Sequence, residues 1–298
     1  MLIPAVNSGE DSDASSEARA VLPDAQLLSD TEMSSLFRGY DSAHGDVILK
    51  ILKTAPSDSA RWLDSADYTA ALGERLLRSG STTSGRRFFL FRFIRGECLS
   101  EVVRPGNVIR GALLDEIAMQ LLRQLAALNL VNQDVVHRDI TPGNMILDFE
   151  DQRAVVRLID YESACFASEP QIPIRAYGFS APEQAEGRAV PSSDLFSFVS
   201  TLYFLAEGTT APAVSSEGRT FSPDTFGQFT EFEELFGVRA LLQCWHEEQD
   251  ERPSSAAAFL RKRIQPGTRV MRPPRPIGTF TVGSQTVDLF DQRYQLRV

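Results

Sequence analysis

The stretch that decides the fold is "VVHRDITPGNMI", Val135 to Ile146, which places a His-Arg-Asp triplet just ahead of an asparagine. Apolar residues flank it on both sides, as expected for a loop between two short strands. Its Asp139 lies five residues before Asn144, and Asp160 follows at the end of the apolar run "VRLI". Phosphoryl transfer needs a carboxylate to orient the attacking hydroxyl and oxygen ligands to hold Mg²⁺ against the phosphates. Because these three residues supply both, the sequence predicts a phosphoryl-transfer site.

The composition suits one large globular unit or two lobes, since 43% of the 298 residues are hydrophobic and 23% are charged. Cys98, Cys165 and Cys244 are far apart and lack CxxC spacing, which indicates neither a disulfide framework nor a zinc site. A formal charge of −10 opposes a general nucleic-acid binder. No apolar stretch approaches the roughly 18 to 20 residues that cross a bilayer, and the start lacks a signal pattern. We therefore expect a cytoplasmic protein with no membrane span and no nucleic-acid partner.

A β-rich part follows an acidic start. Residues 1–24 include the run "NSGEDSDASSEA", which cannot bury enough apolar surface to offset ordering, so we expect this segment to be disordered. Residues 25–96 contain the strand-like runs "AQLL", "SSLFRGY" and "VILKIL", then a helical stretch, then the strand "RRFFLFRFI". The pattern predicts a small β-rich lobe.

The next part, residues 97–264, is mainly helical. Leu113, Ile117, Leu121 and Leu125 recur every four residues and predict a long amphipathic helix. Further helices are expected at "SDLFSFVSTLYFLAEG", "VRALLQCWHEE" and "SSAAAFLRKRI". Together the two parts predict an α+β fold with a small β-rich lobe and a larger helical lobe.

The last segment, residues 265–298, begins with a run rich in proline and arginine. It closes with "TFTVGSQTVDLF", where Gly283 and Ser284 fit the turn of a two-residue β-hairpin. We expect a linker followed by a hairpin tail.

The motifs together resemble the eukaryotic-like Ser/Thr protein kinase family, of the kind also found in bacteria, from about Ala25 to Ile264. The resemblance rests on "HRDITPGN", "IDYESA", "GFSAPEQ", "ERPS", "VILK" and "FLFRFIRGECL". It implies a bilobal protein-kinase-like fold, ATP and Mg²⁺ as cofactors, and a protein substrate or a scaffolded protein partner.

The same resemblance implies roles for individual residues. Asp139 would be the catalytic base, Lys50 would hold the phosphates, and Asn144 and Asp160 would be metal ligands. Architectural roles fall to Glu183, which pairs with Arg252, to Asp194, which braces the catalytic loop, and to Asp67. The residues expected to line the nucleotide are Lys50, Ser29, Thr31, Ser34, Leu36, Ile48, Phe91, Phe93, Ile94 and Ile146.

The nucleotide cradle departs from the family pattern. No glycine lies between Gly9 and Gly39, and Ser29, Thr31 and Ser34 stand at the three glycine positions. Glycines let the backbone approach phosphates closely, so side chains here should loosen the cradle, although hydroxyls could donate hydrogen bonds.

The acidic partner of Lys50 is also atypical. Asp64, Asp67 and Glu74 are the candidates, and spacing favours Asp67, which is one methylene shorter than the family's glutamate. The ion pair is therefore expected to be weak or absent.

The catalytic loop and the segment after Asp160 leave further alternatives open. Arg138 could meet a phosphorylated segment or cap nearby backbone, and Glu162 could be a third metal ligand or stiffen its loop. Thr141 replaces a lysine that many Ser/Thr kinases carry, and Ala176 replaces the threonine that usually bonds to that lysine and the aspartate. These paired changes predict a differently connected loop, which leaves the choice between Ser/Thr and Tyr acceptors open.

Three functions remain compatible with the sequence. The first is a protein kinase that transfers the γ-phosphoryl group of ATP to a Ser/Thr hydroxyl of a protein, which we favour because every residue of the chemistry is present. The second is a pseudokinase that acts as a scaffold or nucleotide-sensing module. The third is a small-molecule phosphotransferase, which "IDYESA" resembles but "GFSAPEQ" and "ERPS" oppose.

Overall fold

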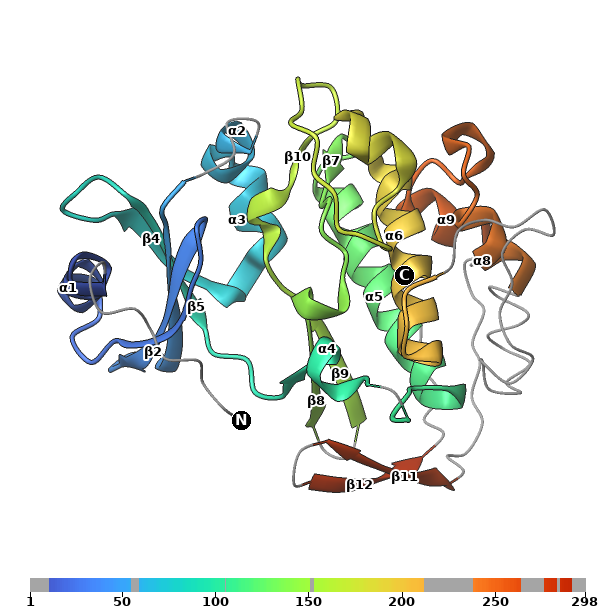
Figure 1. Cartoon of the computed structure of the whole chain (residues 1–298), viewed down its shortest axis with the longest axis horizontal. Helices are drawn as coiled ribbons and strands as arrows, with labels where there is room; N and C mark the ends of the chain where they lie inside the picture. Colours follow the sequence, from blue (N-terminus) through green and yellow to red (C-terminus); the bar gives the residue numbers. More distant parts are fainter. Residues whose placement is uncertain are drawn as a thin grey trace. The chain divides into compact units, whose positions relative to one another are not determined.

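The structure is a computed structural model that describes residues 11–54, 59–104, 106–150, 153–211, 238–263, 276–282 and 285–290. The chain divides into two compact units (Figure 1). We call Met1–Ala60 with Asp64–Ile94 the N-terminal unit, and Arg61–Leu63 with Arg95–Val298 the C-terminal unit. The boundary after Ile94 lies two residues before the one expected from the sequence.

The elements up to residue 94 are α1 (Asp11–Val21), β1 (Gln26–Asp30), β2 (Ser34–Asp41), β3 (Gly45–Leu52), α2 (Ala60–Asp64), α3 (Ala66–Leu72), η1 (Gly73–Arg75), β4 (Leu76–Ser81) and β5 (Arg87–Arg92). Those that follow are β6 (Glu97–Cys98), α4 (Leu99–Val102), α5 (Gly111–Val131), β7 (Val135–Val136), η2 (Pro142–Asn144), β8 (Met145–Glu150), β9 (Arg153–Leu158), η3 (Tyr161–Ser163), β10 (Cys165–Phe166), η4 (Pro182–Glu186), α6 (Pro191–Glu207), α8 (Val238–Cys244), η5 (Gln249–Glu251), α9 (Ala256–Arg263), β11 (Pro276–Val282) and β12 (Gln285–Phe290).

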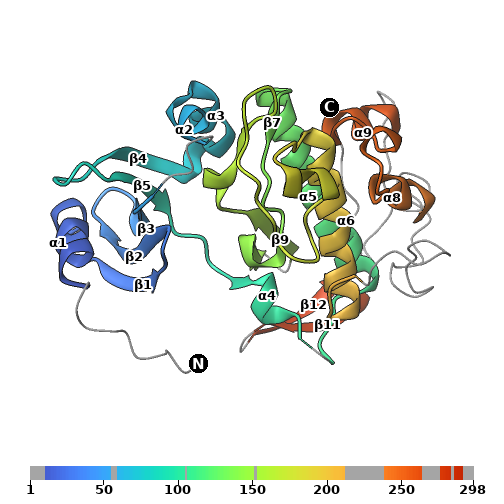
Figure 2. The ribbon, with the colours of Figure 1, turned by 45° about the horizontal axis from the view of Figure 1, so that its top comes forward.

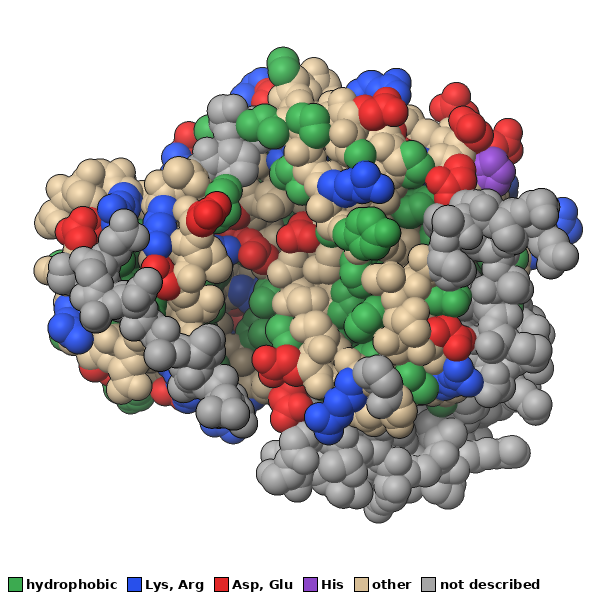
Figure 3. All heavy atoms as spheres, in the orientation of Figure 1, with side chains coloured by type: hydrophobic (Ala, Val, Ile, Leu, Met, Phe, Trp, Pro, Cys, Tyr) green, Lys and Arg blue, Asp and Glu red, His purple; other side chains and the backbone are tan. Residues whose placement is uncertain are grey.

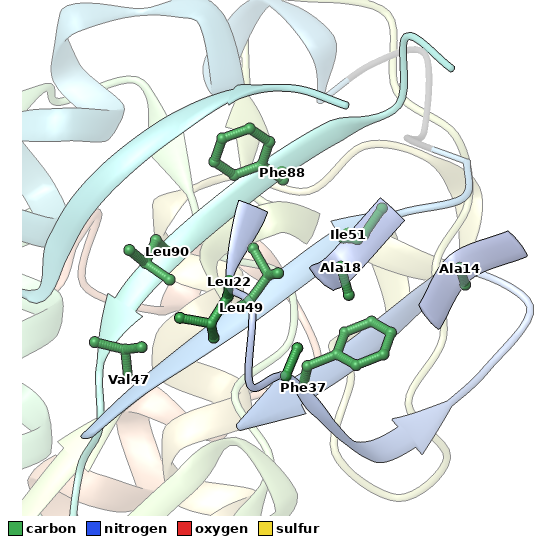
Figure 4. Packing of buried hydrophobic residues seen from close by; sticks show 10 residues of the cluster. Ala14, Ala18, Leu22, Phe37, Val47, Leu49, Ile51, Phe88 and Leu90 are labelled. Atoms are coloured by element: carbon green, nitrogen blue, oxygen red, sulfur yellow. The ribbon is translucent and has the colours of Figure 1, made fainter. Parts of the chain in front are cut away.

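A five-stranded antiparallel sheet in the order β1-β2-β3-β5-β4 forms the centre of the N-terminal unit. Alternation along the strands gives the sheet two distinct faces. One face carries the core cluster drawn in Figure 4, namely Phe37, Val47, Leu49, Ile51, Phe88 and Leu90. Ala14, Ala18 and Leu22 from the α1 region pack against this cluster.

The helix α1 corrects the expectation that residues 1–24 are disordered. Ala14, Ala18 and Leu22 recur every four residues and form a narrow apolar stripe, although the segment is otherwise acidic and polar. Gly39 makes room for this packing, because a Cβ at that position would lie 2.5 Å from Leu22 Cδ2. Residues 1–10 lie outside the described residues.

The opposite face of the sheet carries Leu36, Ile48, Lys50, Phe89 and Phe91. Cross-strand pairing joins Leu36 to Lys50, Ile48 to Phe91, and Lys50 to Phe89. Helix α3 packs on this face, with the ring of its Tyr68 centred 5.2 Å from that of Phe89.

In the C-terminal unit, α5 and α6 run side by side (Figures 1 and 2). Gln120 and Gln124 of α5 form hydrogen bonds with the backbone of β9, along the edge of this strand that faces away from β8. The Gln120 side chain donates to Ala154 O at 2.7 Å and accepts from Val156 N at 2.9 Å. Gln124 likewise binds Val156 O and Leu158 N, each at 2.9 Å. Two helix side chains thus fix the strand that leads to Asp160.

The expected tail hairpin is present as β11 and β12, paired antiparallel with Val282 opposite Gln285. Its predicted turn, Gly283 and Ser284, lies outside the described residues, as do residues 265–275, where the linker is expected. Within the described part of the chain, no helix is long and apolar enough to cross a membrane. On the face drawn in Figure 3, described side chains of both charges are interspersed rather than gathered into a basic patch.

Candidate active site

The peptide groups around Asp139 are held by side chains from three other places in the C-terminal unit. Gln184 Nε2 donates to Arg138 O at 2.5 Å, Asn144 Nδ2 donates to Asp139 O at 3.0 Å, and Thr201 Oγ1 donates to Ile140 O at 3.0 Å. Three consecutive carbonyls therefore each accept a side-chain hydrogen bond. This anchoring fixes the backbone on both sides of the expected base.

Asp194 of α6 braces the start of the same loop. Its carboxylate accepts His137 N at 2.8 Å and Arg138 N at 3.0 Å. Burial raises the pKa of Asp194 to about 7, although the two amides and the nearby Arg138 charge favour the ionised form. The residue lies where the sequence expects a brace.

Asp139 and Asn144 are in direct contact. Asn144 Nδ2 lies 2.7 Å from Asp139 Oδ2 and donates a hydrogen bond to it. Because the amide nitrogen is turned toward Asp139, the Asn144 oxygen is directed elsewhere and can serve as a metal ligand. Asp139 itself is half-buried.

The pairing of β8 with β9 brings Asp160 to this loop. Met145 pairs with Leu158, and Asn144 O accepts Ile159 N at 2.8 Å, so Asp160 follows directly after the contact. Asp160 has a φ of 62°, in the left-handed region that side chains other than glycine rarely adopt. Such strain is commonly found at functional sites, where the surrounding structure enforces it.

The donor set of Asn144 and Asp160 fits Mg²⁺, which prefers amide and carboxylate oxygens. Among the described residues, no three His, Cys, Asp or Glu side chains gather closely enough to hold a metal ion. Glu162 lies buried in η3, two residues after Asp160. Both roles expected for it, a third metal ligand or a residue that stiffens its loop, stay predictions.

His137 and Tyr161 belong to the core of the C-terminal unit. The His137 side chain is fully buried, and its ring centre lies 4.7 Å from that of Tyr161. Trp62, from α2, donates its indole N–H to Tyr161 O at 2.9 Å and meets the Phe166 ring edge-on. These contacts hold the residue that follows Asp160.

Arg138 donates hydrogen bonds to backbone carbonyls, which is one of the two roles that the sequence left open for it. It is 1% exposed, and its Nε donates to Ser163 O at 2.7 Å while Nη1 lies 3.4 Å from Ile172 O. The segment after Asp160 makes a further backbone contact, because Ala167 N donates to Asp134 O at 2.7 Å.

Glu183 and Arg252 form the expected architectural ion pair. Arg252 Nη1 and Nη2 donate to the two carboxylate oxygens at 2.9 and 2.7 Å, and Ser193 Oγ donates at 2.5 Å. Burial alone would raise the pKa of Glu183, but the hydrogen bonds from Arg252 and Ser193 outweigh it and hold the pKa below its usual value. Both partners are buried.

The N-terminal unit places four of the expected nucleotide residues, Leu36, Ile48, Lys50 and Phe91, on the sheet face opposite α1. Of the remaining expected residues, Ile94 ends this unit and Ile146 lies on β8 of the other unit. The backbone amide of Phe93, another of the expected residues, donates to Asp46 O at 3.1 Å.

The turn between β1 and β2 is closed by its own side chains. Thr31 Oγ1 accepts hydrogen bonds from Met33 N at 3.3 Å and Ser34 N at 3.1 Å, and donates to Ser34 O at 3.0 Å. Asp30 is held by Lys53 Nζ at 2.8 Å and Ser35 Oγ at 2.5 Å. Ser29 lies before this turn on β1, opposite Leu36.

The structure gives clear positions to two of the three acidic residues that the sequence offered as partners of Lys50. Asp64 forms an ion pair with Arg87 on β5, and Glu74 lies in η1 directly before β4. Asp67 is half-buried in the first turn of α3 and stays the predicted partner of Lys50.

A model described as protein kinase domain matches residues 77–266, well over half of the chain. The chain belongs to the protein kinase domain family. The matched part of the kinase domain includes Asp139, Asn144 and Asp160 but begins after Lys50 and the β1–β2 turn. The family likeness is thus carried by the catalytic loop and the helical part.

Curated relatives agree with this assignment. This chain is 27% identical over 199 residues to a Ser/Thr-protein kinase of Corynebacterium efficiens, drp72, and the match covers 59% of this chain and 36% of that protein. It is 26% identical over 283 residues to Ser/Thr-protein kinase A of Synechocystis, covering 84% of this chain and 54% of that protein. This chain spans only about a third to a half of the length of these relatives.

A solved structure also supports the α+β kinase fold. The PknI kinase domain of Mycobacterium tuberculosis superimposes with a TM-score of 0.55 at 18% identity, over 80% of this chain and 92% of that one.

Sequence reasoning missed Gln184 and Trp62. Gln184 lies inside the quoted "GFSAPEQ", but no spacing rule marks its amide. Trp62 appears as one apolar residue of an amphipathic stretch, and only its contact with Tyr161 shows where its N–H is used.

Proposed function

We propose that this chain is a protein kinase that transfers the γ-phosphoryl group of ATP to a Ser or Thr hydroxyl of a protein. The observation that carries the proposal is the hydrogen bond from Asn144 Nδ2 to Asp139 Oδ2, in a loop whose carbonyls are anchored on both sides. A general base must be held in position before its substrate arrives, because misplacement sharply reduces the rate.

Each residue then has a defined task. Asp139 orients the acceptor hydroxyl and accepts its proton, and Lys50 binds the phosphates. Asn144 and Asp160 would hold Mg²⁺, which when bound neutralises the charge of the phosphates. Asp194 and Thr201 keep the loop in place.

A cytoplasmic setting is part of the proposal, because Cys98, Cys165 and Cys244 are all free thiols.

The rival function is a pseudokinase, and one observation favours it. The amides of Met33 and Ser34 in the β1–β2 turn are occupied by Thr31, whereas a phosphate-binding loop offers its amides to the ligand. We favour the active enzyme because the polar residues of the transfer step are all retained. A binding module would need only the fold.

The test is to incubate the purified chain with γ-labelled ATP, Mg²⁺ and a mixture of Ser, Thr and Tyr peptides, and to record nucleotide-induced thermal stabilisation in parallel. Label on Ser or Thr peptides, lost in Lys50→Met and Asp160→Asn variants, is the expected result. Stabilisation by nucleotide without label would establish the pseudokinase. In parallel incubations with an aminoglycoside or choline in place of the peptides, label on the small molecule would indicate a small-molecule phosphotransferase. The absence of both label and stabilisation would refute nucleotide use altogether.

A further inference from the structure

Gln184 connects the catalytic loop to the turn that precedes Ala181-Pro182-Glu183. Its side chain is 1% exposed, and Nε2 donates both to Arg138 O at 2.5 Å and to Ser180 Oγ at 3.2 Å. Arg138 is the residue directly before Asp139. A single amide nitrogen therefore contacts both the backbone beside Asp139 and Ser180, near the end of the segment that follows Asp160.

The connection continues through Ser180 into the turn. Ser180 Oγ accepts Ala176 N at 2.8 Å, and Ala176 O accepts the amides of Phe179 and Ser180, each at 3.0 Å. Tyr177, in the middle of this turn, is 80% exposed. This exposed turn and the backbone beside Asp139 are therefore joined through Ser180 and Gln184.

The usual side-chain link between these two segments cannot form here. Ala176 carries only a methyl group, and Thr141 is too short to replace a lysine side chain. Gln184, which follows the turn at residues 176–180, does donate a hydrogen bond to the loop that contains Asp139.

Burying Gln184 is not explained by stability alone. Its Oε1 is buried without a hydrogen-bond partner among the described residues, and an unsatisfied buried acceptor carries a desolvation cost. An apolar side chain of the same length would avoid this cost, but would leave Arg138 O without this donor. Rotating the amide would place Oε1 against Arg138 O, so the donor to the catalytic loop determines the orientation.

The geometry points to Gln184 as a positioning residue that fixes the turn at residues 176–180 relative to Asp139. This inference rests on the proposed kinase function. Its amide acts through the Arg138 peptide and the Ser180 hydroxyl, and does not itself touch the reacting atoms. The predicted effect is on acceptor use and turnover, with nucleotide binding unchanged.

The test compares Gln184→Met, which keeps the length and removes the donor, with Gln171→Met. Gln171 is a matched control because its amide binds Ala189 N at 2.9 Å and Ala189 O at 2.8 Å, with no bond to the catalytic loop. In Gln184→Met we expect kcat/KM for the acceptor peptide to fall about tenfold, as loss of one buried hydrogen bond allows. We expect nucleotide stabilisation to be unchanged and the melting temperature to fall no more than in Gln171→Met. In Gln171→Met the melting temperature should fall while kcat/KM stays within about twofold.

A double-mutant cycle and hydrogen exchange complete the design. Ser180→Ala should lower kcat/KM by less than Gln184→Met, and the double variant should match Gln184→Met, since both act through one connection. Amide exchange in residues 137–141 should be faster in Gln184→Met than in Gln171→Met. An unchanged kcat/KM, or equal exchange in the two variants, would overturn the inference. If the wild-type chain transfers no label, the proposed function fails, and the exchange measurement still decides whether Gln184 holds the loop.

Discussion

The Thr31 hydroxyl accepts a hydrogen bond from the Ser34 amide at 3.1 Å, across the turn where the kinase family usually has glycines. The hydroxyl thereby binds amides of the kind that a phosphate-binding loop offers to its ligand. Under the proposed kinase function, the closed turn opposes nucleotide binding in the N-terminal unit.

Removing this hydroxyl should improve nucleotide binding. Thr31→Val keeps the shape of the side chain but frees the amides of Met33 and Ser34. Each freed amide can then donate a hydrogen bond to a phosphate. Because one such hydrogen bond contributes about 0.5–1.5 kcal/mol, we expect the KM for ATP to fall roughly 2- to 10-fold. Thr31→Ser retains the hydroxyl and should leave the KM unchanged. A higher KM in the valine variant would mean that the closed turn helps to hold the nucleotide.

Breaking the Arg252–Glu183 pair should destabilise the C-terminal unit strongly. Arg252→Leu leaves the Glu183 charge buried without its main partner, and such losses are worth about 3–5 kcal/mol in the free energy of unfolding. The pair holds the pKa of Glu183 below its usual 4.5, so in the wild type its contribution is complete above that value and is lost on acidification through the lower folded pKa. Denaturant titrations at neutral pH measure the loss, and a change under about 1 kcal/mol would contradict the assigned role.

Asp194 should make stability depend on pH in the opposite direction. Folding raises its pKa from 3.8 to about 7, so the folded chain binds this proton more tightly than the unfolded chain does. Its contribution to stability is complete below about pH 4 and is lost as the pH rises through 7. Relative to Asp194→Asn, the wild-type free energy of unfolding should fall by up to roughly 4 kcal/mol between about pH 4 and pH 8. A difference that does not vary with pH would show that Asp194 stays ionised throughout.

The segment after Asp160 should not need phosphorylation to be ordered. Arg138, which could otherwise bind a phosphate, is buried and donates to the carbonyls of Ser163 and Ile172. Ser168 Oγ already donates to Asp134 Oδ2 at 2.5 Å. We expect a Ser163→Ala/Ser168→Ala variant, and wild-type protein treated with phosphatase, to keep activity within about threefold of the untreated wild type. Activity that disappears with phosphatase and returns on rephosphorylation would refute this.

The sequence predicted the two-lobed α+β architecture and the catalytic loop because both depend on local patterns. Asp139 and Asn144 lie five residues apart, so their contact follows from a single loop. Asp160 comes directly after the apolar run "VRLI", most of which lies in β9. The family match to residues 77–266 covers the same region.

What the sequence did not predict depends on contacts between distant residues. The helix α1 looks disordered by composition, and only the apolar face of the sheet provides what Ala14 and Ala18 need to pack. The Gln184 amide could have bonded many carbonyls, and tertiary packing selects Arg138 O. The closure of the β1–β2 turn likewise depends on which amides the Thr31 hydroxyl reaches.

The most direct test of the proposed kinase activity is the rate at which Asp139→Asn transfers labelled phosphate to an acceptor peptide, compared with the wild type. The substitution keeps the size of the side chain but removes the proton acceptor, so nucleotide stabilisation should persist. We expect the rate of transfer to fall at least about 100-fold, as for loss of a general base. Equal rates in the two proteins would contradict the assignment of Asp139 and the kinase mechanism built on it.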